Sequence, residues 1–212
     1  MSATCNNPGV DFINILKDWP ALDYLYYLIA YQCAPVIEKT KPGVILNFTN
    51  NHLHKLNDLW RVGREQLSGS DAFCYRELRV ASQRTTVLFY SPELLGAILA
   101  KRAVAQYLRD CGYREELTLR TTLTDLSRRF QKECPHEVGI FLGIPLADVL
   151  GFIANGGKNA VAEGYWKVYH DVPGRKALFA RYHEAKLRLI RFVKAGNQPL
   201  AYLGVHVLAL VK

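Results

Sequence analysis

The sequence predicts a single α+β domain, with an α/β arrangement as the alternative, in which several helices surround a small sheet. Two β-rich segments separated by a polar turn predict a hairpin near residues 73–90. Helix-start signals and apolar stretches with helical spacing lie on both sides of it. Helices alternate with a few strands along the chain, which is compatible with either arrangement. The 212 residues, 50% of them hydrophobic, suffice for one core.

The first predicted helix begins at the Asp-Trp-Pro sequence of residues 18–20, since proline is favoured in a first helical turn. Ala21–Tyr31 is apolar on nearly every side, which predicts a buried helix. Pro35 should disturb or end this helix because proline has no backbone N–H to donate. The β-branched and apolar residues 44–48 predict a strand, and residues 52–67 predict a helix.

The centre of the chain contains the predicted hairpin and the clearest helix start. Phe73–Val80 and Thr85–Tyr90 are rich in β-branched and aromatic residues, with a polar turn between them. The Ser-Pro-Glu sequence at 91–93 combines a capping hydroxyl, a first-turn proline and a carboxylate near the positive helix end. We expect one helix from here to the Cys-Gly pair at 111–112, where glycine can end it.

The remaining elements are mostly helical. Residues 117–130 are ambiguous, because their threonines favour a strand whereas their leucines repeat with helical spacing, and we predict a helix. Residues 135–142 and 145–154 predict two short helices, and residues 165–169 predict a strand. An amphipathic helix is predicted over 177–193.

Composition narrows the class of protein. No stretch reaches the roughly 18 apolar residues of a membrane span, and the first residues lack a basic start and an apolar core. We therefore expect a cytoplasmic protein without a secretion signal. The five cysteines contain no CxxC pair, which indicates reduced thiols and predicts neither a disulfide framework nor a metal site.

The net charge of +8 lies mostly after residue 60 and permits an acidic partner. The expected domain is residues 1–212, with 1–10 and 196–212 as candidate tails. Residues 200–212 are compatible with an edge strand or an interface. Cofactor, partner identity and oligomeric state are not predicted.

Three motifs resemble those of an uncharacterised bacterial family found mainly in anaerobes. They are Pro-His-Glu at 135–137, Leu-Gly at 142–143 and Gly-Tyr-Trp-Lys-Val-Tyr at 164–169. The resemblance covers about residues 20–195. Ile144 departs from the tyrosine of the family's Leu-Gly-Tyr motif, and His170 stands where members usually carry glycine. The resemblance implies no reaction.

The favoured site combines a histidine and a glutamate at a helix start with an aromatic and lysine-bearing strand face. His136 and Glu137 supply groups that titrate or orient a ligand. On a strand, Tyr165, Lys167 and Tyr169 would share one face, and the residues between them would face the core. We therefore predict an accessory protein that binds a small planar or anionic ligand, a cofactor or a protein partner.

Two alternatives belong to other functional classes. An enzyme would use His136 and Glu137 as acid and base, with Cys33 as nucleophile, and Cys134 is a second candidate thiol. Residues 137–153 also have the spacing of a helix-turn-helix, which would make the protein a DNA-binding regulator. Nucleic acid is the less favoured partner, because the second helix offers a single acidic side chain where base-reading groups would be needed.

Overall fold

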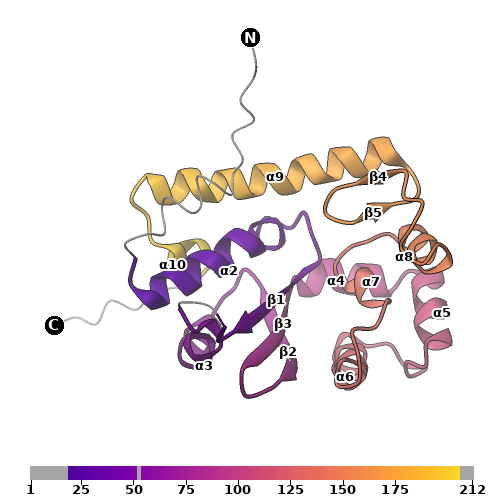
Figure 1. Cartoon of the computed structure of the whole chain (residues 1–212), viewed down its shortest axis with the longest axis horizontal. Helices are drawn as coiled ribbons and strands as arrows, with labels where there is room; N and C mark the ends of the chain where they lie inside the picture. The colour runs from indigo at the N-terminus through magenta and orange to yellow at the C-terminus, as the bar shows by residue number, and fades with distance from the viewer. Residues whose placement is uncertain (1–18, 52–53, 206–212) are drawn as a thin grey trace, which may run out of the picture.

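The computed structural model describes residues 19–51 and 54–205 of the chain. It confirms the predicted α+β class: helices surround a three-stranded antiparallel sheet, and a two-stranded hairpin lies beside them (Figure 1). No helix in the described ranges is both long enough and apolar enough to span a bilayer.

The sheet has the order β1-β3-β2, with β3 in the centre. Strand β1 is Gly43–Thr49, β2 is Cys74–Val80 and β3 is Arg84–Tyr90. The β2–β3 pairing confirms the predicted hairpin, with Arg76 opposite Leu88 and a register shift between Glu77 and Arg79. Strand β1 confirms the strand predicted over 44–48.

Alternation along β3 divides the core into two parts, because successive strand residues point to opposite faces. Val87 and Phe89 pack in one cluster, which also contains Trp60 stacked on Phe48 with ring centroids 4.8 Å apart. The helices on this side are α2 (Ala21–Ile37), α3 (Leu56–Leu67), α9 (Val172–Lys194) and α10 (Pro199–Tyr202).

Leu88 points the other way, into a second cluster. The helices on that side are α4 (Pro92–Leu99), α5 (Arg102–Asp110), α6 (Leu119–Phe130), α7 (Val138–Phe141) and α8 (Leu146–Ala154). In Figure 1, α9 runs along the top of the view, over α2 at one end and over the β4–β5 hairpin at the other. Strands β4 (Ala162–Glu163) and β5 (Lys167–Val168) form that hairpin.

The prediction of one helix from 91 to 111 is wrong, because the chain breaks into α4 and α5 at Ala100–Lys101. Lys101 is extended, with a ψ of 124°. Leu95 and Val104 are nine residues apart and would lie about 180° apart on a continuous helix. The break allows both side chains to enter the same core.

Two other boundaries differ from the prediction. Helix α3 begins at Leu56 and not at 52, because Lys55 adopts a left-handed conformation with a φ of 44°; residues 52–53 lie outside the described residues. Pro35 lies inside the last turn of α2 and does not end it at once. Its carbonyl accepts hydrogen bonds from the backbone N–H groups of Thr40 and Lys41, which close the end of the helix.

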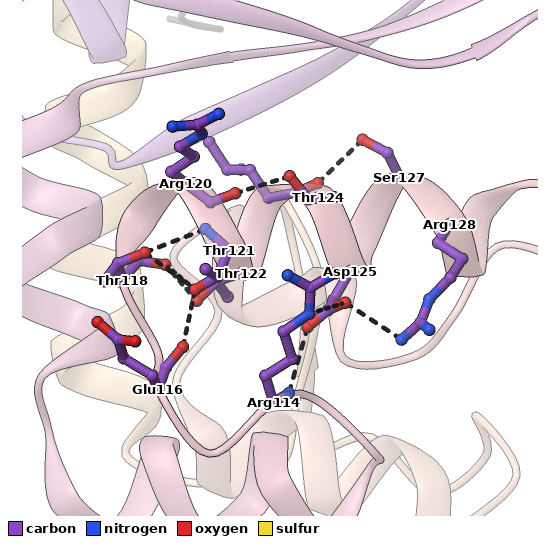
Figure 2. A network of polar contacts seen from close by, with 11 residues as sticks. Arg114, Glu116, Thr118, Arg120, Thr121, Thr122, Thr124, Asp125, Ser127 and Arg128 are labelled. Carbon is purple, nitrogen blue, oxygen red and sulfur yellow. Dashed lines mark hydrogen bonds and ion pairs between the residues drawn. The ribbon is translucent and has the colours of Figure 1, made fainter.

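Helix α6 confirms the helix favoured over 117–130, and Figure 2 shows how it accommodates its threonines. The Thr118 hydroxyl caps the helix by accepting from the Thr121 N–H. The hydroxyls of Thr122 and Thr124 donate to carbonyls four residues earlier. Buried Asp125 accepts from the Arg114 N–H and also pairs with the Arg128 guanidinium. These contacts satisfy the polar groups locally, so the strand preference of threonine is overridden.

Candidate functional site

A mostly apolar cavity of about 260 Å³, the α7–α8 pocket, lies beside the two short helices and strand β5. Its lining residues come from the segment before α7, the α7–α8 hairpin, α8 and β5. They are Cys134, Pro135, His136, Val138, Gly139, Leu142, Ile144, Asp148, Val149, Phe152, Trp166 and Lys167. Three parts of the chain that carry the family-like motifs therefore meet around one cavity.

Two glycines bring α7 close to its neighbours. A Cβ on Gly139 would lie 3.0 Å from Val149 Cγ2, so its absence allows α7 to pack directly on α8. Gly143 ends α7 with a φ of +80°, a conformation that favours glycine. A Cβ there would lie 2.5 Å from Pro42. The Leu-Gly motif thus fixes the turn that forms one side of the pocket.

Asp148 on α8 organises the opposite side. Its carboxylate is 1% exposed and accepts hydrogen bonds from the Trp166 indole N–H at 3.0 Å and from the backbone N–H groups of Tyr169 and His170, both at 2.9 Å. Arg175 Nε lies 3.4 Å away as an ion pair that lacks hydrogen-bond alignment. One carboxylate therefore holds the 166–170 segment against α8 and orients Trp166 toward the pocket.

The exposed rim of the pocket carries rings and a cation. The His136 and Phe152 rings lie 5.6 Å apart between centroids, and both side chains reach the surface. The Lys167 ammonium donates to the Gly157 carbonyl at 2.7 Å and lies 3.9 Å from the Glu163 carboxylate. Trp166 is largely buried and packs edge-on against Phe179.

Glu137 does not join His136 at the pocket, which corrects the predicted pairing. Its carboxylate is 3% exposed, pairs with the Arg129 guanidinium and accepts from the Tyr113 hydroxyl at 3.3 Å. Burial, followed by the nearby Glu137 charge, raises the pKa of Tyr113 above its ordinary value. Both residues lie in the turn that precedes α7, where Glu137 points into the core and His136 reaches the surface.

The predicted face of Tyr165, Lys167 and Tyr169 is also divided. Only residues 167–168 pair as a strand, so the alternation does not extend to the two tyrosines. The Tyr165 ring lies against Phe179 and Tyr182 of α9, with centroids 5.5 and 5.1 Å apart. The Tyr169 ring packs on Gly151, and its hydroxyl is buried without a hydrogen-bond partner among the described residues. Of the predicted ligand-binding set, His136 and Lys167 line the pocket.

Sequence reasoning missed Asp148, Phe152 and Trp166 as pocket residues. Asp148 could have been found, because it is the single charged residue in the apolar stretch 144–154. A buried carboxylate in such a stretch requires several donors. Trp166 was expected to pack in the core, and it does, yet one side of it faces the pocket.

The two candidate thiols are not activated. Cys33 is fully buried, and burial raises its pKa well above the ordinary value. Cys134 is exposed at the pocket, but partial burial and then the Glu137 charge raise its pKa as well. Both thiols are protonated at neutral pH, whereas nucleophilic cysteines carry lowered pKa values. Within residues 19–51 and 54–205, no three His, Cys, Asp or Glu side chains gather to hold a metal ion.

The outer face of α8 bears on the helix-turn-helix alternative. Leu150, Phe152 and Ile153 are its exposed large side chains, at 44%, 37% and 41% exposure. These groups supply no hydrogen bonds to base edges. A second hollow of about 380 Å³ includes Arg79 and Arg84. It is lined by residues of all three strands of the sheet and of α6, together with Cys134, and by no residue of α8. Arg79 and Arg84 therefore lie outside the segment with helix-turn-helix spacing.

The Gly-Tyr-Trp motif begins with a glycine, Gly164, because the Phe179 ring packs directly against this position. A Cβ at this position would overlap the Phe179 ring, which contacts both Tyr165 and Trp166. We expect Gly164→Ala to lower the free energy of unfolding by about 1–3 kcal/mol through overpacking. Urea unfolding would measure this, and Gly69→Ala serves as a control because nothing lies within 4 Å of its Cβ position. Equal stability of the Gly164→Ala and wild-type proteins would contradict the packing described here.

The protein is an α+β domain in which the family-like motifs meet around one mostly apolar cavity. The Cys134 thiol at this cavity is not activated. A family model described as "Protein of unknown function (DUF3793)" matches residues 29–202. The chain belongs to this family, which confirms the expected membership in a family of unknown function. Searches of curated proteins and of solved structures found no match.

Proposed function

We propose that the protein binds a small planar ligand in the α7–α8 pocket and acts as an accessory binding protein. The observation that carries this proposal is the lining of the cavity: His136, Phe152 and Trp166 surround a mostly apolar space. Aromatic rings bind planar molecules through stacked or edge-on contacts. The volume of about 260 Å³ lies just below the roughly 300–1,000 Å³ of pockets for drug-sized ligands. A ligand of one or two rings therefore fits better than a dinucleotide.

The Lys167 ammonium at the rim of the pocket indicates that the ligand carries an acidic group. An ammonium has three donors, and Lys167 uses one on the Gly157 carbonyl. The nearby Glu163 carboxylate is 3.9 Å away and largely exposed, so it leaves the cation able to bind another anion. A small aromatic carboxylate would place its ring among the aromatic side chains and its charge at Lys167. This ligand class combines the planar and anionic characters predicted from the sequence.

Saturation-transfer NMR with benzoate, nicotinate and indole-3-carboxylate tests the proposal. We expect transfer from the wild-type protein to at least one of the three probes. Phe152→Ala should weaken its binding about fivefold, since an aromatic contact contributes about 1 kcal/mol beyond area burial. Ile153→Ala is the matched control, because Ile153 is an exposed neighbour on α8 outside the pocket lining. No transfer to any probe, or equal binding by the Phe152→Ala variant, would contradict the proposal.

A further inference from the structure

Two lysines meet around the ring of Tyr165, on the side of the β4–β5 hairpin that faces α9. Lys41 follows α2, and its ammonium lies 5.6 Å from the Tyr165 centroid and 5.3 Å from the Tyr182 centroid. Lys186 on α9 lies 5.3 Å from the Tyr165 centroid and 4.7 Å from the Tyr31 centroid. Aromatic faces attract cations, but they do not neutralise charge.

No carboxylate in the described part of the chain pairs with either lysine. The two acidic residues nearest to them in sequence, Glu38 and Glu184, pair with arginines of α9 instead. The Lys186 ammonium donates to the Gln32 side-chain oxygen at 3.3 Å. Two positive charges therefore adjoin each other without a fixed counter-charge from residues 19–51 or 54–205.

The arrangement is electrostatically costly. Lys41 is only 9% exposed, and burial followed by the Lys186 charge lowers its pKa to about 8. Burial also lowers the pKa of Lys186. The neighbouring Cys33 is fully buried and protonated, so it does not supply a negative charge. A buried cation without a partner destabilises the fold unless a ligand provides the missing charge.

We propose that Lys41 and Lys186 form a second ligand site, which binds a tetrahedral oxyanion such as sulfate or the phosphate group of a small molecule. The two ammonium groups offer several donors to one anion. Tyr165, whose ring both ammonium groups approach, is 39% exposed and borders an open hollow that Phe179, His183 and Glu184 also line. This site is separate from the α7–α8 pocket, which Trp166 and Lys167 line.

Thermal unfolding in sodium sulfate, with sodium chloride added to hold ionic strength constant, tests the site. At sulfate concentrations about 100-fold above the dissociation constant, we expect the Tm of the wild-type protein to rise by about 5–10 °C. Lys41→Met and Lys186→Met should each weaken sulfate binding about tenfold, the value of one charge-assisted hydrogen bond. Lys176→Met is the matched control, because Lys176 is exposed on the same helix. The proposal is overturned if sulfate raises the Tm of Lys41→Met and Lys186→Met as much as that of the wild type, or if it does not raise the Tm of the wild type.

Sulfate keeps its charge between pH 7 and 9.5, so its affinity at these two values reports the protonation of the protein. The groups that face Lys41 are Lys186 and Tyr182 of α9, Cys33 of α2 and Tyr165 of the hairpin. Burial raises the pKa values of both tyrosines to about 12, so they stay neutral over this interval. As the pH rises through about 8, Lys41 loses its proton. Binding should weaken about tenfold for one lost ammonium contact; unchanged affinity contradicts the site.

Protection from chemical modification provides a measurement on the unaltered chain. Reductive methylation followed by peptide mass spectrometry reports how fast each lysine reacts. We expect saturating sulfate to slow modification of Lys41 and Lys186 at least fivefold relative to chloride, and to leave Lys176 unchanged. Equal rates in sulfate and chloride at Lys41 and Lys186 overturn the proposal. Phe152→Ala should not alter this protection, which separates the anion site from the proposed pocket function.

Discussion

Replacing Asp148 with alanine is expected to lower the free energy of unfolding by about 3–5 kcal/mol, the range for breaking a buried ion pair from one side. The substitution removes the acceptor for the Trp166 indole N–H and for the backbone N–H groups of Tyr169 and His170. It also leaves Arg175, which is 21% exposed, without its closest carboxylate. Three donors would lose their acceptor together, and Arg175 would keep only its ion pair with Asp171, 3.5 Å away.

Urea unfolding of Asp148→Ala beside Asp110→Ala measures this effect. Asp110 is exposed and accepts only from Gln106 among the described side chains, so its loss should change stability by no more than about 0.5 kcal/mol. Near-ultraviolet circular dichroism of the Asp148 variant should also lose part of the tryptophan signal, because Trp166 is no longer oriented. Wild-type stability in Asp148→Ala would show that the 166–170 segment is held by apolar packing alone.

Replacing Glu137 with alanine should cost about 3 kcal/mol, whereas His136→Ala should change stability by less than about 0.5 kcal/mol. Glu137 is buried between Arg129 and Tyr113, and its removal strands a guanidinium that also donates to the Cys111 carbonyl at 2.8 Å. His136 is exposed and contacts the Phe152 ring. Although the two residues are adjacent, one stabilises the fold and the other lines the pocket.

Chemical denaturation of the two variants, with probe binding measured by saturation transfer on each, separates these roles. Glu137→Ala should be less stable but retain probe affinity below its unfolding transition. His136→Ala should keep its stability and bind the probes several-fold more weakly. Weaker stability in His136→Ala together with unchanged stability in Glu137→Ala would reverse the assignment. That result would favour the predicted role of Glu137 as an acid or base at the ligand site.

Local signals predicted much of the fold. The hairpin, the capped start of α4 and the glycine turn after α7 depend on interactions between residues close in sequence, which propensity and capping rules describe. The break between α4 and α5 could not be read in the same way. Leu95 and Val104 each fit a helix, and only the position of the shared core decides that both must face it.

The candidate site was predictable in part. His136 and Lys167 were chosen for their chemistry and do line the pocket. Tyr165 and Tyr169 were assigned from a strand predicted over residues 165–169, but only residues 167–168 form it, and packing on α9 and α8 determines the positions of the two tyrosines. The Lys41–Lys186 pair is invisible in sequence because it forms only when α9 packs against α2. Long-range packing, and not residue type, decided each of these outcomes.

Native mass spectrometry of the protein purified without oxygen tests the central claim most directly, because it detects a retained ligand of any chemical identity. We expect wild-type protein and Ile153→Ala to carry a small additional mass that is lost on denaturation, and Phe152→Ala to carry less of it. An additional mass retained equally by Phe152→Ala would place the ligand elsewhere. A bare polypeptide in all three samples, together with the absence of probe binding, would contradict a ligand-binding role for the α7–α8 pocket.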